Sequence, residues 1–225
     1  MEVRRFGVFI AVAMMIAMAF VSPAPATAKA PGGHDDSPWH MYGESSYVKI
    51  GEKGNQWAIG LESRWGPYDY HGTPYEYSFA GVYFTPPNDK PIYFKDLSVL
   101  QFDFFMTEGN AYGGSPRFTL FMWDGVSPSW FVIYIYLGNP PSFIGGLPMN
   151  EWTSTGNFIG SMEKRFQIGW FPWTLADYEG ALSLAGELGI YYIYIDLDSG
   201  WSGNDQAMLV DNICINNFVN KGNPP

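Results

Sequence analysis

Two acidic side chains near the C-terminal end could carry out chemistry as a pair. Asp196 and Asp198 are two residues apart at the end of a predicted strand, so both should point to one face of it. Paired carboxyl groups are the working parts of glycoside hydrolases. The next alternate position is Gly200 rather than a third acid, and carboxylates at a strand end more often form turns or bind calcium. Asp196 and Asp198 are candidate catalytic residues, but the sequence favours a protein that is not an enzyme.

A second candidate site is an aromatic surface on two neighbouring strands. The predicted strands 117–123 and 130–137 are joined by a short turn, so they should pair antiparallel and share their faces. Flat rings stack on the C–H faces of sugars, and a polar group at the rim binds hydroxyls. The same pattern also fits a face covered by the helix, the N-terminal segment or a second chain. The outer side should carry Phe121, Trp123, Tyr134 and Tyr136, with Arg117 at the rim.

Asp211 marks a candidate calcium site on the last long predicted strand. Several carbohydrate-binding jelly rolls hold a structural calcium ion through an Asp on that strand. Backbone carbonyls and another acid, such as Asp205, could complete a set of oxygen ligands. The alternative is that Asp211 caps a turn or pairs with a lysine. A structural calcium ion is thus the single cofactor that the sequence suggests.

Other chemistries lack the residues they need. His34, His40 and His71 have no metal-ligand spacing to one another or to the lone cysteine, Cys214. The sequence contains no Gly-x-Ser-x-Gly elbow and no phosphate-binding glycine loop. The net charge of −10 argues against nucleic acid and anionic membranes as partners.

The elements that must position these residues are mostly strands. Short β-type runs alternate with clusters of Gly, Pro, Asn and Asp, which indicates an all-β fold, an antiparallel jelly-roll β-sandwich. One segment differs: Thr174 and Asp177 resemble a capping box, and leucines follow before Gly189. We predict one short α-helix at about 174–188. The predicted strands are 47–50, 57–61, 75–84, 97–106, 117–123, 130–137, 190–197 and 207–215.

The N-terminal residues have the order of a secretory signal peptide. Arg4 and Arg5 precede an apolar run of 16 residues and then a stretch of small residues. The run is short of the roughly 20 residues that span a bilayer, so we expect cleavage after Ala28, with an uncleaved anchor as the alternative. The protein should then be secreted and extracellular, without a membrane span in its mature chain. The expected division is 1–28 signal peptide, 29–38 linker, 39–218 β-sandwich domain and 219–225 flexible tail.

Three stretches together resemble a known group of domains. They are 100–104, then 113–118 with 123–125, and finally 198–201 leading to 209–213. They resemble secreted jelly-roll β-sandwich domains that are similar in layout to carbohydrate-binding modules and galactose-binding-like domains. The resemblance covers about 97–216 and implies a fold more than an activity, because such sandwiches host binding modules, filament subunits and glycosidases.

These observations rank three functions. The first is a secreted, non-catalytic module that binds a polysaccharide or glycoconjugate through its aromatic strand face. The second is a structural extracellular protein, a filament or surface-layer-type subunit that self-assembles by strand pairing. The third is a glycoside hydrolase. The expected partner is therefore a carbohydrate or a cell-surface protein.

Overall fold

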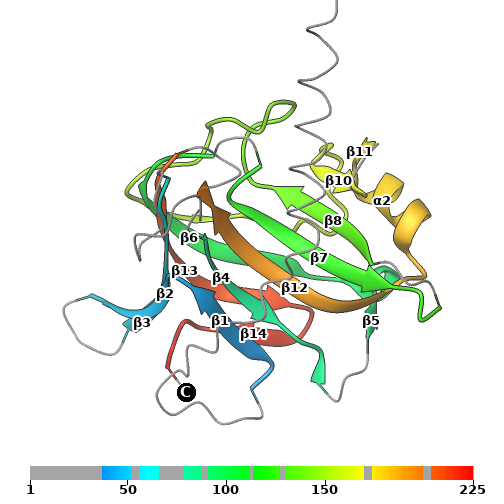
Figure 1. Ribbon diagram of the computed structural model, residues 1–225, viewed down its shortest axis with the longest axis horizontal. Helices are drawn as coiled ribbons and strands as arrows, with labels where there is room; N and C mark the ends of the chain where they lie inside the picture. The colour runs from blue at the N-terminus through cyan, green and yellow to red at the C-terminus, as the bar shows by residue number, and fades with distance from the viewer. Residues whose placement is uncertain are drawn as a thin grey trace, which may run out of the picture.

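Two antiparallel sheets make up most of the structure (Figure 1). The computed structural model describes residues 37–51, 56–65, 79–87, 91–111, 114–126, 130–169, 174–199 and 204–224. The eight-stranded sheet has the order β1 (Trp39–Gly43), β4 (Phe79–Phe84), β12 (Gly189–Asp198), β7 (Arg117–Trp123), β8 (Phe131–Tyr136), β10 (Phe166–Ile168) and β11 (Thr174–Ala176), and β5 (Ile92–Tyr93) also pairs with β12. The six-stranded sheet has the order β2 (Ser45–Ile50), β3 (Gln56–Ser63), β13 (Gln206–Ile215), β6 (Leu100–Glu108) and β9 (Trp152–Ser154), and β14 (Phe218–Asn220) pairs with β13.

The predicted all-β sandwich is confirmed. Every pairing between these strands is antiparallel. Along the described strands the chain passes from one sheet to the other seven times: between β1 and β2, β3 and β4, β5 and β6, β6 and β7, β8 and β9, β9 and β10, and β12 and β13. Neighbours within a sheet are therefore often far apart in sequence, as the double-sheet architecture of a jelly roll requires.

The core lies between the two sheets and follows the period of two. In β6, Leu100, Phe102 and Phe104 are buried, and in β7 the buried inner residues include Phe118. Ring contacts join the layers: the centroid of Phe118 lies 5.1 Å from that of Phe102 and 5.8 Å from that of Phe158. The alternate side chains of β7 and β12 consequently point away from the core, onto the outer face of the eight-stranded sheet.

The predicted helix is shorter than 174–188 and starts later. Thr174 does not cap it, because Thr174–Ala176 forms β11 and pairs with β10. Asp177 is the N-cap, and its carboxylate accepts a 2.9 Å hydrogen bond from the backbone N–H of Gly180. The α-helix, α2, covers Tyr178–Ala185, and the backbone N–H of its C-cap residue, Gly186, donates to the carbonyl oxygen of Leu182 at 2.8 Å. An Asp in the N-cap position satisfies the free backbone donors of the first turn, so Asp177 sets the boundary.

Several predictions fall outside the described residues. The signal peptide, most of the linker and residues 75–78 of one predicted strand are among them. Within the residues that the structure describes, none of the helices is long and apolar enough to span a membrane. A short 3-10 helix, η2 (Phe94–Asp96), precedes β6, so that strand begins at Leu100 rather than at 97.

Candidate functional site: a charged cluster beside a strip of rings

One row of residues crosses five strands on the outer face of the eight-stranded sheet. The aligned residues run from β1 through β4, β12 and β7 to β8. Because aligned residues in neighbouring strands lie about 5 Å apart and point the same way, their side chains form one continuous line. The row is Tyr42, Gly81, Asp196, Arg117 and Tyr136.

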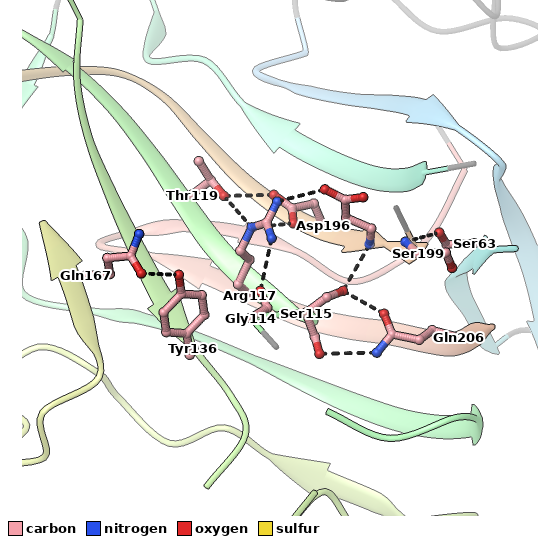
Figure 2. A network of polar contacts seen from close by, with 11 residues as sticks. Ser63, Gly114, Ser115, Arg117, Thr119, Tyr136, Gln167, Asp196, Ser199 and Gln206 are labelled. Atoms are coloured by element: carbon pink, nitrogen blue, oxygen red, sulfur yellow. Dashed lines mark hydrogen bonds and ion pairs between the residues drawn. The ribbon is translucent and has the colours of Figure 1, made fainter. Parts of the chain in front are cut away.

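A buried ion-pair cluster occupies the middle of this row (Figure 2). The Nε atom of Arg117 lies 3.0 Å from Oδ1 of Asp196, and its Nη2 atom lies 3.2 Å from Oδ2 of Asp198. Nη1 of Arg117 donates to the carbonyl oxygen of Gly114 at 3.1 Å. The hydroxyl of Thr119 donates to Oδ2 of Asp196 at 2.8 Å. The two acids that the sequence paired for catalysis thus share a single guanidinium group.

A second set of hydrogen bonds anchors this cluster to the ends of its strands (Figure 2). The backbone N–H of Asp198 donates to Oγ of Ser115 at 3.0 Å. Ser115 in turn donates to Oε1 of Gln206, at the start of β13, at 2.6 Å. The N–H of Ser199 donates to Oγ of Ser63 in β3 at 2.8 Å. Both sheets therefore hold the charged cluster in place.

Burial and the neighbouring charges together set the pKa values of Asp196 and Arg117. It raises the pKa of Asp196, while the guanidinium of Arg117 pulls that pKa down and Asp198 raises it again. Burial alone would lower the pKa of Arg117, but the two carboxylates outweigh it, so its pKa lies above the ordinary value. Oδ1 of Asp196 accepts no hydrogen bond from any residue that the structure describes; its contact with Arg117 is an ion pair without hydrogen-bond geometry. A raised pKa in a buried, charge-paired carboxyl group occurs both in structural ion pairs and in catalytic acids, so the electrostatics of Asp196 alone do not separate the two roles.

Gly81 makes room for Tyr42 beside the cluster. A Cβ atom at Gly81 would lie 2.3 Å from the hydroxyl oxygen of Tyr42 and 2.4 Å from its Cζ atom, so the ring lies directly over the glycine. Burial, with Asp196 nearby, raises the pKa of the Tyr42 hydroxyl well above its ordinary value. The phenol therefore stays neutral next to the carboxylate.

We expect Gly81→Ala to displace the Tyr42 ring, because the new methyl group and the ring cannot occupy the same space. Overpacking of this kind costs about 1–3 kcal/mol of stability, measurable by urea denaturation. Gly60→Ala, in β3 of the other sheet, is the comparison: its Cβ would lie 2.7 Å from a methyl carbon of the stiff, β-branched Val48, so it should also cost stability, but Tyr42→Ala should not restore it. The double variant Gly81→Ala, Tyr42→Ala should regain stability relative to Gly81→Ala, and a further loss would contradict the steric account.

The predicted aromatic surface is only partly open. As predicted, β7 and β8 pair and place Phe121, Tyr134 and Tyr136 on one face with Arg117. Tyr136 is only 4% exposed, however. The ring of Phe143 covers the Tyr136 ring at a centroid distance of 4.5 Å. The hydroxyl of Tyr136 donates to Oε1 of Gln167 at 2.7 Å. Arg117 is itself buried and lies over the Tyr134 ring, 5.0 Å from its centroid.

The segment that follows β8 is the reason for this burial. Nη1 of Arg165 donates to the carbonyl oxygens of Tyr136, Leu137 and Gly138 at 3.0, 2.9 and 2.6 Å. The N–H of Phe143 donates to the carbonyl oxygen of Asn139 at 2.7 Å, and this turn brings Phe143 onto Tyr136. Arg117 and Tyr136 therefore do not form the open rim and platform that the sequence suggested.

Rings from other strands extend the open part of this face. The Tyr194 ring, on β12, stacks on Tyr83 at 5.1 Å and meets the edge of Phe121 at 5.3 Å. Trp130 contacts Trp123 at 6.0 Å and Tyr192 at 6.1 Å. We call this set the ring strip: His40, Tyr83, Phe121, Trp123, Trp130, Tyr192 and Tyr194. Trp130 and His40 are exposed and the others half-buried.

The two acids proposed for calcium lie apart. Asp205 precedes β13, and Asp211 lies well inside it, so six residues of extended chain, about 20 Å, separate them. Asp205 accepts from the backbone N–H of Trp65 at 2.6 Å, whereas Asp211 accepts from that of Asn212 at 2.7 Å. The two cannot ligate one ion. Among the described residues no three His, Cys, Asp or Glu side chains gather to hold a metal, and a calcium ion at Asp211 stays a prediction.

Comparisons with known proteins give little beyond the fold. No family model and no curated protein matches the sequence. A solved structure, described as an exo-β-agarase, is similar at a TM-score of 0.41 and 16% sequence identity, over 87% of this chain and 24% of that chain. This chain thus spans about a quarter of that protein's length. A likeness of this degree does not indicate what this chain binds.

Proposed function

We propose that the protein is a non-catalytic binding module for polysaccharide, and that the sugar chain lies along the ring strip. The observation that carries the proposal is the run of partly exposed rings across β1, β4, β12 and β7. Aromatic faces bind the apolar faces of sugar rings, and tyrosine hydroxyls add polar contacts at their edges. A strip of such rings suits a chain of repeating sugar units.

The charged cluster supports binding rather than hydrolysis. A hydrolase needs one carboxyl group to donate a proton and another to act as nucleophile or base. In this protein Asp196 is buried and held by Arg117 and Thr119, and Asp198 pairs with the same arginine. Both carboxylates are thus engaged by one guanidinium, which supports a structural and binding role for the pair.

We expect Trp130→Ala to weaken retention on immobilised polysaccharide by about 30-fold or more, since removing an exposed aromatic anchor of a binding surface can cost about 2 kcal/mol or more. Affinity electrophoresis of the purified protein through gels that contain soluble polysaccharides measures this change. Release of reducing sugar should stay at background in the same samples.

Trp152→Ala is the matched control. Trp152 is 43% exposed and Trp130 is 44% exposed, but Trp152 lies on β9 of the other sheet and contacts Phe105 at 5.7 Å. Equal retention of the two variants would reject the ring strip as the binding surface. Sugar release that Asp198→Asn abolishes would show a hydrolase instead.

A further inference from the structure

The ring strip and the charged cluster lie on one strand and give the binding face two different ends. Tyr192, Tyr194, Asp196 and Asp198 are alternate residues of β12 that point outward. Six residues of extended chain, about 20 Å, separate the first from the last. A polysaccharide that binds the ring strip where it crosses β12 and continues along that strand would therefore contact rings at one end and the Asp198 carboxylate at the other.

Asp198 is the member of the cluster that faces outward. Its side chain is 31% exposed, against 11% for Asp196 and 11% for Arg117. Phe79 pairs with it across the β4–β12 ladder and is 38% exposed. A ligand at this end of the strip thus meets a carboxylate next to an aromatic ring, the combination that contacts both the edge and the face of a sugar.

The cluster carries an excess of negative charge. It holds two carboxylates and one guanidinium, and the whole chain has a net charge of −10. Ionised carboxylates accept strong hydrogen bonds from hydroxyl groups. The same charge repels uronate and sulfate groups, and repulsion of this kind is an effective way to discriminate between ligands.

We propose that Asp198 is the specificity-determining residue of the strip: it accepts hydrogen bonds from the hydroxyls of an uncharged polysaccharide and excludes acidic ones. This inference rests on the proposed polysaccharide-binding function. Arg117 acts as a positioning residue, because its Nη2 atom holds the Asp198 carboxylate at 3.2 Å while Asp196 holds its Nε atom at 3.0 Å. A carboxylate that is fixed before binding loses less entropy when the ligand arrives.

Affinity electrophoresis on two panels tests this inference. The neutral panel contains mixed-linkage β-glucan, galactomannan and agarose, and the acidic panel contains alginate, pectate and carrageenan. The wild-type chain should be retained by a neutral polysaccharide and not by acidic ones. Asp198→Asn should weaken that retention about tenfold or more and increase retention on the acidic panel. Asp198→Glu keeps the charge and should keep the preference for neutral polysaccharides.

Asp103→Asn is the control, because Asp103 lies on β6 of the other sheet, and its loss changes the net charge equally. If the wild-type chain binds neutral polysaccharide, Trp130→Ala binds weakly and Asp198→Asn binds like wild type, the inference fails while the proposed function stands. Wild-type binding of acidic polysaccharides as tight as that of neutral ones also overturns it. If no polysaccharide retains the wild-type chain, the proposed function fails, and this inference with it.

Discussion

Replacing Arg117 with Met is expected to lower the free energy of unfolding by about 3–5 kcal/mol, because it leaves a buried carboxylate without its counter-ion. The guanidinium pairs with Asp196 at 3.0 Å and with Asp198 at 3.2 Å. Met has a similar length and fills most of the space. Urea denaturation at pH 7 measures the change.

The same variant should lose less stability in acid. Burial already raises the pKa of Asp196, and the opposing effect of Arg117 would be gone. A carboxyl group whose pKa is higher in the folded state than in the unfolded state binds more protons when folded. The folded state of Arg117→Met is therefore penalised most above the folded pKa of Asp196. As the pH falls from there toward about 4, the ordinary range of an Asp, the difference from wild type should shrink.

Arg64→Met provides the control for this prediction. Arg64 also pairs with several carboxylates, among them Glu108 at 2.6 Å and Asp205 at 3.5 Å, but its side chain is 40% exposed. Exposed ion pairs contribute about 0–1 kcal/mol. Equal losses in the Arg117 and Arg64 variants would mean that the buried cluster does not behave as a low-dielectric ion pair.

Replacing Phe118 with Ala is expected to lower the free energy of unfolding by about 3–5 kcal/mol, because it leaves a cavity in the packed core between the sheets. Phe118 is fully buried and contacts Phe102 of the other sheet and Phe158. For domains of about 150–250 residues each kcal/mol lowers Tm by about 2–4 °C, so differential scanning calorimetry should show a large shift.

Phe105→Ala separates the core effect from the loss of any ring. Phe105 lies one residue from two core positions of β6, but it points to the outer face, where it is half-buried beside Trp152. Its replacement should cost clearly less than that of Phe118. A comparable loss at Phe105 would show that the two faces of β6 are packed alike, against the period of two.

The long strands could be predicted because their pattern is local. Runs of β-type residues between turn residues predicted the bounds of β7, Arg117–Trp123, and placed β12 and β13 within one residue. The three-residue strands β9, β10 and β11 have too few residues for a period to show. The start of the helix was wrong, because Thr174 pairs in a ladder while Asp177 caps the helix.

The site was predicted in pieces. Asp196 with Asp198 and Arg117 with Tyr134 stood out in the sequence as separate candidates, and the pairing of β12 with β7 joins them. That pairing connects distant parts of the chain, and no local pattern encodes it. The rings of Tyr192 and Tyr194 alternate with Ile193 and Ile195, so the signal for an outward face was present. The sequence did not indicate which strands pair with β12.

The ring strip is assembled from β1, β4, β12, β7 and Trp130, segments that are spread over most of the sandwich. No fragment of the chain contains it, so the unfolded chain lacks the proposed binding surface. Ligand that binds only the native state raises its apparent stability by RT ln(1 + [L]/Kd). Each polysaccharide that occupies this face should therefore also act as a thermal stabiliser, and a melting curve can serve as the binding assay.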